Sequence, residues 1–261
     1  MPSRLERVQA FAESASTIAS GAELHLLLDE TVRDFGADYF LMIHHADFST
    51  APAGLVRIGN YPLEFISISR QDGRPLHDPI MDACERTLAG FFWDEVWSIV
   101  TPTERNRRRA AAVAQSGLGD GFVVPTHIPG EHLGSCHFAV RAGRHLPREN
   151  SAALQAIAAF GFEAARRLAG EAKAPLRRGA PLTDRQRECI ILCAQGKSDS
   201  VIAQLLGLSH KTVNAYVEAA KRRYGVATRG QLIVRALYAS DITFHDIVGP
   251  PSAGRGPAAC N

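Results

Sequence analysis

Histidines are the residues of this sequence that first raise the question of a metal site. His127, His132 and His137 recur at intervals of five residues, which is not a typical spacing of zinc ligands. His44 and His45 are adjacent on an expected strand, so at most one of them is expected to face the interior. We predict no metal site and expect the three spaced histidines to lie at a polar surface.

The glycine-rich segment 117–121 is the second candidate for chemistry. It precedes an expected strand, whereas a phosphate-binding loop follows a strand and opens a helix. The sequence also lacks the Gly-x-Ser-x-Gly and His-Glu-x-x-His signatures of known hydrolases and proteases. We therefore predict no catalytic residues and no cofactor, and an enzyme is disfavoured.

The C-terminal part of the chain predicts four short helices with recognisable ends. They begin at Thr183, Ser198, His210 and Thr228, and they end near Gly196, Leu206, Tyr224 and Tyr238. Thr183 and Gln186 can form a capping box, and Gly196 is suited to end the first helix. The second helix is expected to bury Val201, Ile202, Leu205 and Leu206. A short helix, a glycine-containing turn and another helix form a helix-turn-helix.

The third of these helices has one apolar and one polar face. Its apolar stripe is Val213, Tyr216, Val217, Ala220 and Tyr224. A recognition helix places its N-terminal residues at base edges and its flanking cations at phosphates. We therefore assign DNA-binding roles along the polar face. The base-facing residues are Lys211, Thr212 and Asn214, and the phosphate-facing residues are Lys221 and Arg222.

The charge of the chain supports this interpretation, although the net charge is only +2. Residues 174–261 carry 12 Lys and Arg against 6 Asp and Glu, and the remainder carries 17 against 21. A basic domain behind an acidic one is typical of a nucleic-acid partner. A segment rich in Pro and Gly separates the two, so we expect domains at 1–169 and 182–248, a linker at 170–181 and a disordered tail at 249–261.

The C-terminal pattern resembles the LuxR-type helix-turn-helix domain over about 60 residues. The resemblance is carried by Leu182, Thr183, Arg185, Glu188, Ala194, Gly196, Lys197, Ser198, Ile202, Ala203, Leu206, Leu208, Ser209, Thr212, Val213, Val226 and Arg229. Gln186 and Val201 stand where the family usually has Glu. Gln186 can still close the capping box, and both changes are structural.

The N-terminal part predicts an α+β domain. The expected helices span 4–19, 22–35, 82–88, 103–115 and 148–168, and the expected strands span 39–46, 55–58, 121–128 and 134–141. Antiparallel strands flanked by helices indicate an α/β/α sandwich that is large enough to hold a ligand. The complete fold class is therefore this sandwich followed by a small all-α four-helix domain.

A second resemblance covers the N-terminal domain. The pattern looks like the autoinducer-binding domain of the LuxR family. The residues that carry this resemblance are Asn60, Tyr61, Pro62, Phe65, Ser69, Asp78, Pro79, Phe92, Trp93, Gly117, Leu118, Gly121 and Pro125. The resemblance implies an N-acyl-homoserine lactone between the sheet and the helices. It implies that Asp78 accepts the ligand amide N–H, that Tyr61 donates to the acyl carbonyl, and that Trp93 packs on the lactone ring.

Three positions depart from that family pattern. Phe65 stands where a Trp usually donates to the lactone carbonyl, and Phe has no donor. Ser69 replaces a bulky Tyr, and His137 falls where a small hydroxyl residue is common. These changes predict an altered head-group or acyl preference, or a ligand that is not a lactone. The simpler alternative is that Phe65 and Trp93 are core aromatics and that Asp78 with Pro79 only begins a helix.

The composition limits where the protein works. The chain is 46% hydrophobic and 21% charged, as expected for a globular protein. It has no apolar run of about 18 residues and no apolar signal segment, so no membrane partner is expected. The five cysteines are scattered and fit a reducing cytoplasm.

The two resemblances together predict a ligand-responsive transcription regulator that binds a pseudo-palindromic DNA site as a homodimer. The helix 148–168 could form the dimer surface through Ala152, Ala153, Ile157, Ala158, Phe160 and Phe162, or simply cover the sheet. One alternative is a regulator of the same type that responds to another small molecule or to none. A phosphorelay output protein is disfavoured because no receiver-like βα pattern precedes the helices, and an enzyme with an added DNA module is disfavoured as above.

Overall fold

The computed structural model describes residues 2–46, 54–62, 78–104, 106–108, 117–128, 131–170 and 182–248. The chain forms two compact units, Met1–Ala174 and Pro175–Asn261, and each is described by itself below. Residues 171–181 of the predicted linker and the predicted tail 249–261 lie outside the described residues.

A five-stranded antiparallel sheet organises the N-terminal unit. Its order is β2-β1-β5-β4-β3. The strands are β1 (Tyr39–His44), β2 (Arg57–Gly59), β3 (Phe91–Phe92), β4 (Leu118–Thr126) and β5 (Gly134–Arg141). The four predicted strands are present with ends shifted by a few residues. The two-residue edge strand β3 was not predicted, because it is too short to show any alternation.

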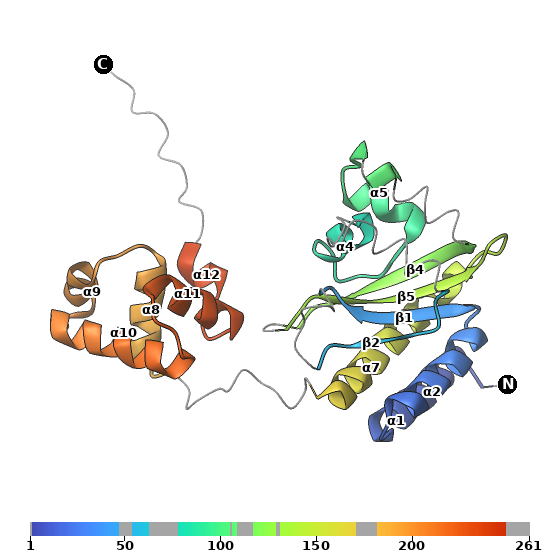
Figure 1. The fold of residues 1–261 in the computed structure, drawn as a ribbon, viewed down its shortest axis with the longest axis horizontal. Coiled ribbons are helices and arrows are strands. Elements are labelled where there is room, and N and C mark those ends of the chain that lie inside the picture. Colours follow the sequence, from blue (N-terminus) through green and yellow to red (C-terminus); the bar gives the residue numbers. More distant parts are fainter. Residues whose placement is uncertain are drawn as a thin grey trace, which may run out of the picture. The chain divides into compact units, whose positions relative to one another are not determined.

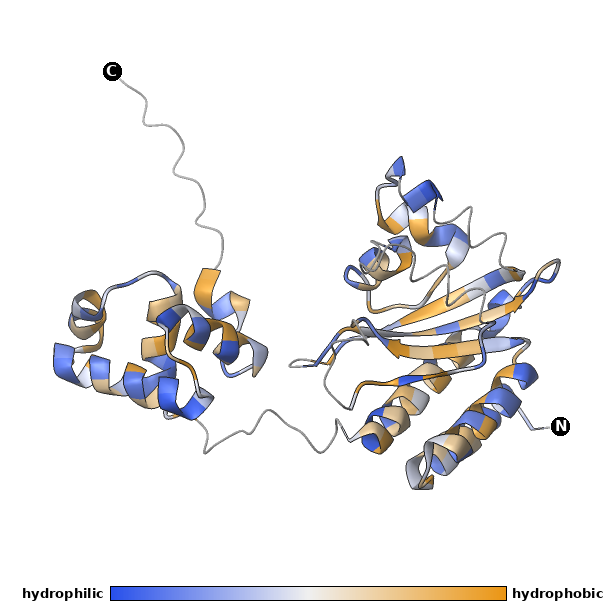
Figure 2. Cartoon of the chain, in the orientation of Figure 1, coloured by the Kyte–Doolittle hydropathy of each residue, from blue (hydrophilic) through white to orange (hydrophobic). Residues whose placement is uncertain are grey.

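Helices α1 (Arg4–Thr17), α2 (Gly21–Asp34) and α7 (Ser151–Ala169) cover one face of this sheet, which we call the core face (Figure 1). Ser3 and Ser20 cap the first two helices through their side chains. Strand residues Phe40, Met42 and Phe138 are buried there against α2 and α7. Apolar residues follow the strands and the packed helix faces (Figure 2). This layer is the main hydrophobic core of the unit.

Helices α4 (Pro79–Cys84) and α5 (Val96–Ile99) lie over the opposite face of the sheet, which we call the α4 face (Figure 1). The single turn η1 (Trp93–Glu95) precedes α5, and a second turn, η2 (Arg148–Asn150), precedes α7. The predicted α/β/α sandwich is confirmed. The helix expected at 82–88 begins earlier because Asp78 and Pro79 form its N-terminus, and the helix expected at 103–115 is described only at 104 and 106–108.

The adjacent histidines at the end of β1 are both turned away from solvent, since His44 is buried and His45, which follows the strand, is half-buried, so the prediction that at most one would face the interior is wrong. His44 is fully buried on the core face, where its Nδ1 accepts the Val56 N–H at 2.9 Å and its ring packs edge-on against Phe162. His45 lies on the α4 face, where its Nε2 is 2.7 Å from the Ser135 hydroxyl. Alternation along the strand holds, but helices cover both faces of the sheet.

The described part of the C-terminal unit, residues 182–248, contains five helices. They are α8 (Asp184–Ala194), α9 (Asp199–Leu206), α10 (His210–Tyr224), α11 (Arg229–Tyr238) and the unpredicted α12 (Phe244–Val248). The capping boxes at Thr183 and Thr228 are present. Gly207 ends α9 with a φ of 66°, a left-handed conformation that glycine adopts at little cost. No helix in the described part of either unit is long and apolar enough to cross a bilayer.

The core of this unit confirms the stripe predicted for α10, because Val213, Val217 and Ala220 are buried and Tyr216 and Tyr224 pack against them. The prediction for α9 is partly wrong. Ile202 is buried, but Val201 and Leu205 are exposed. Ala203 is buried beside Ile202 and Leu206 packs against the same core, so the inward side of α9 runs through residues 202, 203 and 206.

Candidate ligand site and DNA-reading helix

Strand register places the α4-face residues in rows across three strands. The rows are Tyr39, Ala139 and Gly121, then Leu41, His137 and Val123, then Ile43, Ser135 and Pro125. Alternate residues of a strand point to opposite faces. Their neighbours Met42, Phe138 and Val124 accordingly belong to the core on the other side. The rows therefore form a floor whose side chains face α4.

Tyr61 and Trp93 lie together at the first row. Tyr61 is buried, and its ring centroid lies 6.1 Å from that of Tyr39 and 6.4 Å from that of His137. Burial raises the pKa of the Tyr61 phenol, which keeps the hydroxyl protonated and able to donate. Trp93 packs directly over Gly121, where a side chain would collide with the indole. The two resemblance-derived residues are thus brought together.

The indole N–H of Trp93 is buried, and it has no hydrogen-bond acceptor among the described residues. A buried donor without a partner costs free energy, about 1–3 kcal/mol in measured cases. Such groups are rare in folded proteins, and each one calls for an explanation. Trp93 therefore brings an aromatic ring against Gly121 of the first row and a buried hydrogen-bond donor without an acceptor among the described residues.

Asp78 begins α4 and also faces the floor. Its Oδ1 accepts the N–H of Ile80 at 3.0 Å, and Pro79 occupies the first helical position. Asp78 and Pro79 therefore begin a helix, as the simpler alternative predicted. The same carboxylate acts electrostatically on His45, His137 and Cys84. Asp78 thus contributes negative charge to the space between α4 and the sheet.

His137 does not lie at a polar surface, so that prediction is wrong for this residue. It is half-buried on the α4 face, and its Nε2 lies 2.7 Å from the Ser135 hydroxyl. His127 and His132 are exposed as expected. Burial lowers the pKa of His137 to about 4 and that of His45 to about 4, with Asp78 opposing the effect in both cases. Both imidazoles are neutral at pH 7.

Phe65 and Ser69, the other two predicted ligand contacts, lie outside the described residues. A surface depression of about 550 Å³ does occur in the unit, lined by Asp94, Gly119, Asp120, Gly143, Arg144, His145, Leu146 and Arg148. None of the predicted ligand residues lines it. Arg148 is already paired with Asp94 and Glu95 there, so we do not assign the ligand to this depression.

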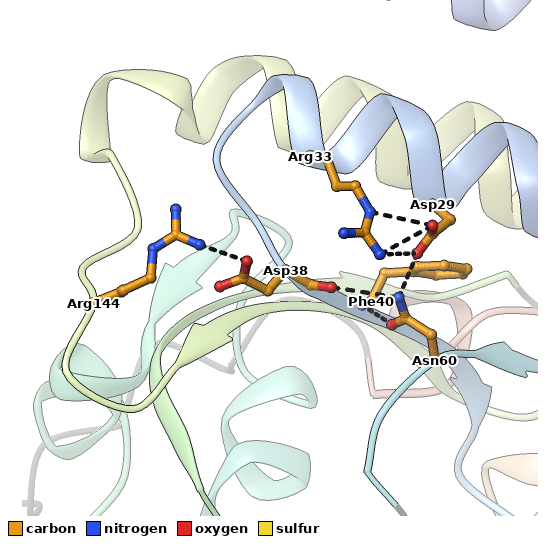
Figure 3. A network of polar contacts seen from close by, with 6 residues as sticks. All are labelled: Asp29, Arg33, Asp38, Phe40, Asn60 and Arg144. Atoms are coloured by element: carbon orange, nitrogen blue, oxygen red, sulfur yellow. Dashed lines mark hydrogen bonds and ion pairs between the residues drawn. The ribbon is translucent and has the colours of Figure 1, made fainter.

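A polar network holds the residue that precedes Tyr61 (Figure 3). The Asn60 side chain donates to Asp29 Oδ1 at 2.6 Å and accepts the Phe40 N–H at 2.8 Å. Asp29 also accepts two hydrogen bonds from Arg33, which lower the pKa of its carboxyl. Asn60 thereby ties the end of β2 to β1 and α2, and this positions Tyr61 at the floor.

Three residues of the site were not predicted: His45, Ser135 and Cys84. Ser135 is fully buried between two imidazoles, and burial raises the pKa of the nearby Cys84 thiol, which Ser135 lowers. The even spacing of Ser135 and His137 on one strand was a usable signal, since it places both on one face. The pairing of His45 with Ser135 depends on a contact between residues 90 positions apart, which no local pattern contains.

The three predicted base-facing residues at the N-terminus of α10 differ in their exposure. Lys211 and Asn214 are exposed. Thr212 is half-buried, and its hydroxyl lies 2.7 Å from that of Ser209, which caps the helix. Lys211 and Asn214 are therefore free to reach a base edge, whereas Thr212 is engaged in the cap.

The two predicted phosphate contacts also differ. Lys221 Nζ donates to Glu218 at 2.7 Å and its side chain is only 19% exposed. Arg222 is exposed and has no ion-pair partner among the described residues. Residues 211, 214, 218 and 222 lie on one side of the helix, since i, i+3 and i+4 positions are neighbours. Arg222 therefore extends the exposed cationic face, and Lys221 is largely neutralised.

This difference predicts unequal effects on DNA affinity. Arg222→Gln is expected to reduce the slope of log affinity against log salt by about 1, because one phosphate contact is lost. Lys221→Gln is expected to change the slope much less, since Glu218 already holds the ammonium. Titration of a labelled 30-bp duplex of arbitrary sequence at several salt concentrations measures both. Equal slopes for the two variants would contradict the assignment.

Comparison with known proteins identifies the class of the chain. Residues 20–165 match the autoinducer binding domain family, and residues 180–236 match the bacterial regulatory proteins of the luxR family. The first match alone spans more than half of the chain. The protein therefore belongs to the luxR family of regulators that carry an autoinducer-binding domain and a DNA-binding helix-turn-helix.

Several members of this family are similar along most of their length. The transcriptional activator BjaR1 of Bradyrhizobium diazoefficiens is 27% identical over 208 residues, which cover 76% of this chain and 78% of BjaR1. The activator AhyR of Aeromonas hydrophila is 24% identical over 238 residues, covering 89% and 90%. The crystal structure of Escherichia coli SdiA has the same fold, with a TM-score of 0.63 at 18% identity over 90% of this chain and 98% of SdiA.

Proposed function

We propose that this regulator senses an N-acyl-homoserine lactone on the α4 face of its sheet and thereby controls DNA binding in the cytoplasm. The observation that carries the proposal is the buried Trp93 N–H beside Tyr61. The Trp93 N–H and the Tyr61 hydroxyl are two hydrogen-bond donors at this place, and the carboxylate of Asp78 faces them from α4. A lactone head with an amide offers two carbonyls and one N–H, which matches this set of groups.

The substitution at Phe65 fits the same proposal. Phe65 has no donor for the lactone carbonyl, and Trp93 has an N–H without an acceptor among the described residues. The hydrogen bond to the lactone carbonyl therefore moves from position 65 to Trp93. Ligand changes DNA affinity only to the extent that it binds one conformation better than another.

A second candidate ligand is a non-lactone acyl compound. SdiA, which shares the fold with a TM-score of 0.63, has a solved structure in complex with octanoyl-rac-glycerol. A glycerol ester also has a carbonyl, and its two free hydroxyls could donate to Asp78 in place of an amide N–H. The two candidates are therefore separated by which compound binds, and Asp78→Asn tests the role of Asp78 in binding either one.

The test compares ligands and one conservative substitution. The full chain is titrated calorimetrically with N-octanoyl-homoserine lactone and with 1-octanoyl-rac-glycerol. Asp78→Asn is expected to weaken lactone binding at least about 10-fold, because a hydrogen bond to a charged group is worth about 1.5–3 kcal/mol. Asn also caps helices well, so α4 is expected to persist. Glu85→Gln, at the exposed far end of α4, is the control and is expected to bind as the wild type does.

The outcomes distinguish the candidates. Lactone binding that falls in Asp78→Asn and not in Glu85→Gln supports the proposal. Binding of the glycerol ester without binding of the lactone favours the second candidate. Failure of every acyl-homoserine lactone to bind the wild-type chain would sink the lactone proposal.

We further propose that the regulator binds a pseudo-palindromic site as a homodimer. Two-fold symmetry doubles the DNA contacts of a small reading domain. On α7, Ile157, Ala158 and Phe162 are buried against the sheet, so the covering role is correct for them. Ala152 and Phe160 are exposed, Phe160 to 47%, and remain available to a second copy.

Sedimentation of the ligand-bound chain is expected to give about twice 28.2 kDa, and a 28.2 kDa species at micromolar concentration would contradict the dimer.

A further inference from the structure

A continuous line of polar side chains crosses the apolar floor of the α4 face. The Ser135 hydroxyl lies 2.7 Å from His45 Nε2 and 2.7 Å from His137 Nε2. We call His45, Ser135 and His137 the polar strip. Ser135 is fully buried and the two histidines are half-buried. The strip is therefore an interior feature, and its hydrogen-bonding groups need partners.

The strip begins beside the head of the proposed site and leads away from it. The ring of His137 lies 6.4 Å from that of Tyr61. Ser135 is two residues further along β5, and His45 lies beyond it at the end of β1. Two residues of a strand span about 6.6 Å. A ligand whose head contacts Tyr61 and Trp93 would thus lay its acyl chain along the strip.

The layer opposite the strip is also polar. Asp78 of the α4 N-terminus acts electrostatically on both imidazoles, and the buried Cys84 thiol at the end of α4 belongs to the same layer. Val123 and Leu41 flank His137 in its row and supply the apolar part of the floor. The space between α4 and the sheet is therefore lined by mixed polar and apolar groups, and it differs from a purely aliphatic channel.

The polar strip has hydrogen-bonding groups that no described residue satisfies. Both imidazoles are neutral, so the Ser135 hydroxyl donates to one Nε2 and accepts from the other. One histidine then keeps a free Nδ1–H donor, and the other keeps an Nδ1 acceptor. No described residue bonds to either Nδ1. A plain alkyl chain laid here would leave both groups without a partner, whereas an oxygen on the chain would bond to one of them.

We propose that the polar strip makes this receptor selective for acyl chains that carry a hydroxyl or oxo substituent. His45, Ser135 and His137 are the specificity-determining residues. This inference rests on the proposed lactone function, because the direction of the chain along the strip follows from a head group at Tyr61 and Trp93.

The experiment compares ligands of one chain length on the full chain. The probes are N-octanoyl-, N-(3-oxooctanoyl)-, N-(3-hydroxyoctanoyl)- and N-(8-hydroxyoctanoyl)-homoserine lactone, each measured by titration calorimetry. At least one oxygenated probe is expected to bind about 5- to 10-fold more tightly than the plain octanoyl probe, the effect of one neutral hydrogen bond. For each variant we compare the ratio of the dissociation constant of the plain octanoyl probe to that of an oxygenated probe. A smaller folded fraction of a variant affects both constants equally, so it does not change this ratio.

Substitutions in the strip test which residues are responsible. His137→Phe removes one of the two free Nδ1 groups, and Ser135→Ala releases both imidazoles from the orientation that the hydroxyl holds, so each is expected to lower that ratio toward 1. His127→Phe changes an exposed histidine on the neighbouring strand end and is expected to keep the wild-type ratio. Ser135→Thr retains the hydroxyl and is expected to keep most of the preference.

Each outcome decides between the two proposals. Equal affinities for plain and oxygenated chains, or a preference that survives both Ser135→Ala and His137→Phe, overturns the selectivity and leaves the lactone function standing. If no lactone binds the wild-type chain, the proposed function fails, and the inference that rests on it fails as well. A preference that disappears in the strip variants and persists in His127→Phe supports the inference.

Discussion

Lowering the pH from 6.5 to 4 is expected to cost the N-terminal unit about 3 kcal/mol of its free energy of unfolding through His44 alone. Burial lowers the pKa of His44 from 6.5 to about 4. Glu131 opposes this shift, while His132 and Arg166 add to it. Nδ1 accepts the Val56 N–H, so a second proton on the ring would also break that hydrogen bond.

The sign of the effect follows from the two pKa values. Between pH 6.5 and 4 the unfolded chain binds a proton that the folded unit does not bind. Stability is therefore complete above pH 6.5 and is lost as the pH falls toward 4. Burial lowers the pKa of His45 and of His137 in the same direction. These two residues are expected to add to the loss.

Urea unfolding at pH 7, 6, 5 and 4 measures this effect. Both tryptophans of the chain, Trp93 and Trp97, belong to the N-terminal unit, so their fluorescence reports on that unit alone. His44→Asn retains an acceptor for Val56 and removes the titration, so its stability is expected to fall less steeply with acid. His127→Asn, at an exposed position, serves as the control. Parallel pH curves for His44→Asn and the wild type would refute the assignment.

Adding one methyl group at Gly121 is expected to disrupt the site. A Cβ there would lie 2.6 Å from Trp93 Cζ2, and real Cβ atoms essentially never approach so closely. The indole is held between β4 and the layer that contains α5, so it cannot move without opening that packing. Gly121→Ala is therefore expected to cost about 1–3 kcal/mol and to abolish ligand-induced stabilisation.

Gly21→Ala is the matched control for this substitution. Gly21 begins α2, and a Cβ there would meet nothing within 4 Å. Alanine has a higher helix propensity than glycine, so a gain of up to about 1 kcal/mol is expected. Thermal unfolding with and without lactone compares the two variants. A Gly121→Ala protein that is as stable and as responsive as the wild type would show that Trp93 is not confined as described.

Local sequence patterns predicted the parts of the structure that depend on neighbours in the chain. The α10 stripe through Val213 and Val217 is confirmed, because a helix buries residues that recur every three or four positions. The Thr183 capping box is confirmed for the same kind of reason. The α/β/α layers followed from the order of helices and strands. These features need only the 3.6- and 2-residue periods of regular structure.

The errors at His45 and His137 involve contacts between distant parts of the chain. Alternation places His44 and His45 on opposite faces, but it does not show that α4 and α5 cover the second face. His137 was expected at the surface because its partner Ser135 and the α4 layer are not visible in a strand pattern. Lys221 was predicted to contact a DNA phosphate, and its hydrogen bond to Glu218 was not predicted. The i, i+3 spacing of the two residues was a usable signal for that bond.

The alternation of β5 has a practical consequence for protein engineering. Cys136, Phe138 and Val140 point into the core, and Ser135, His137 and Ala139 point toward α4. A combinatorial library limited to the second set would vary the chemistry presented to small molecules, and the packing that supports the fold would stay constant. The strand could therefore serve as a template for biosensors, in which new analytes are selected without redesigning the scaffold.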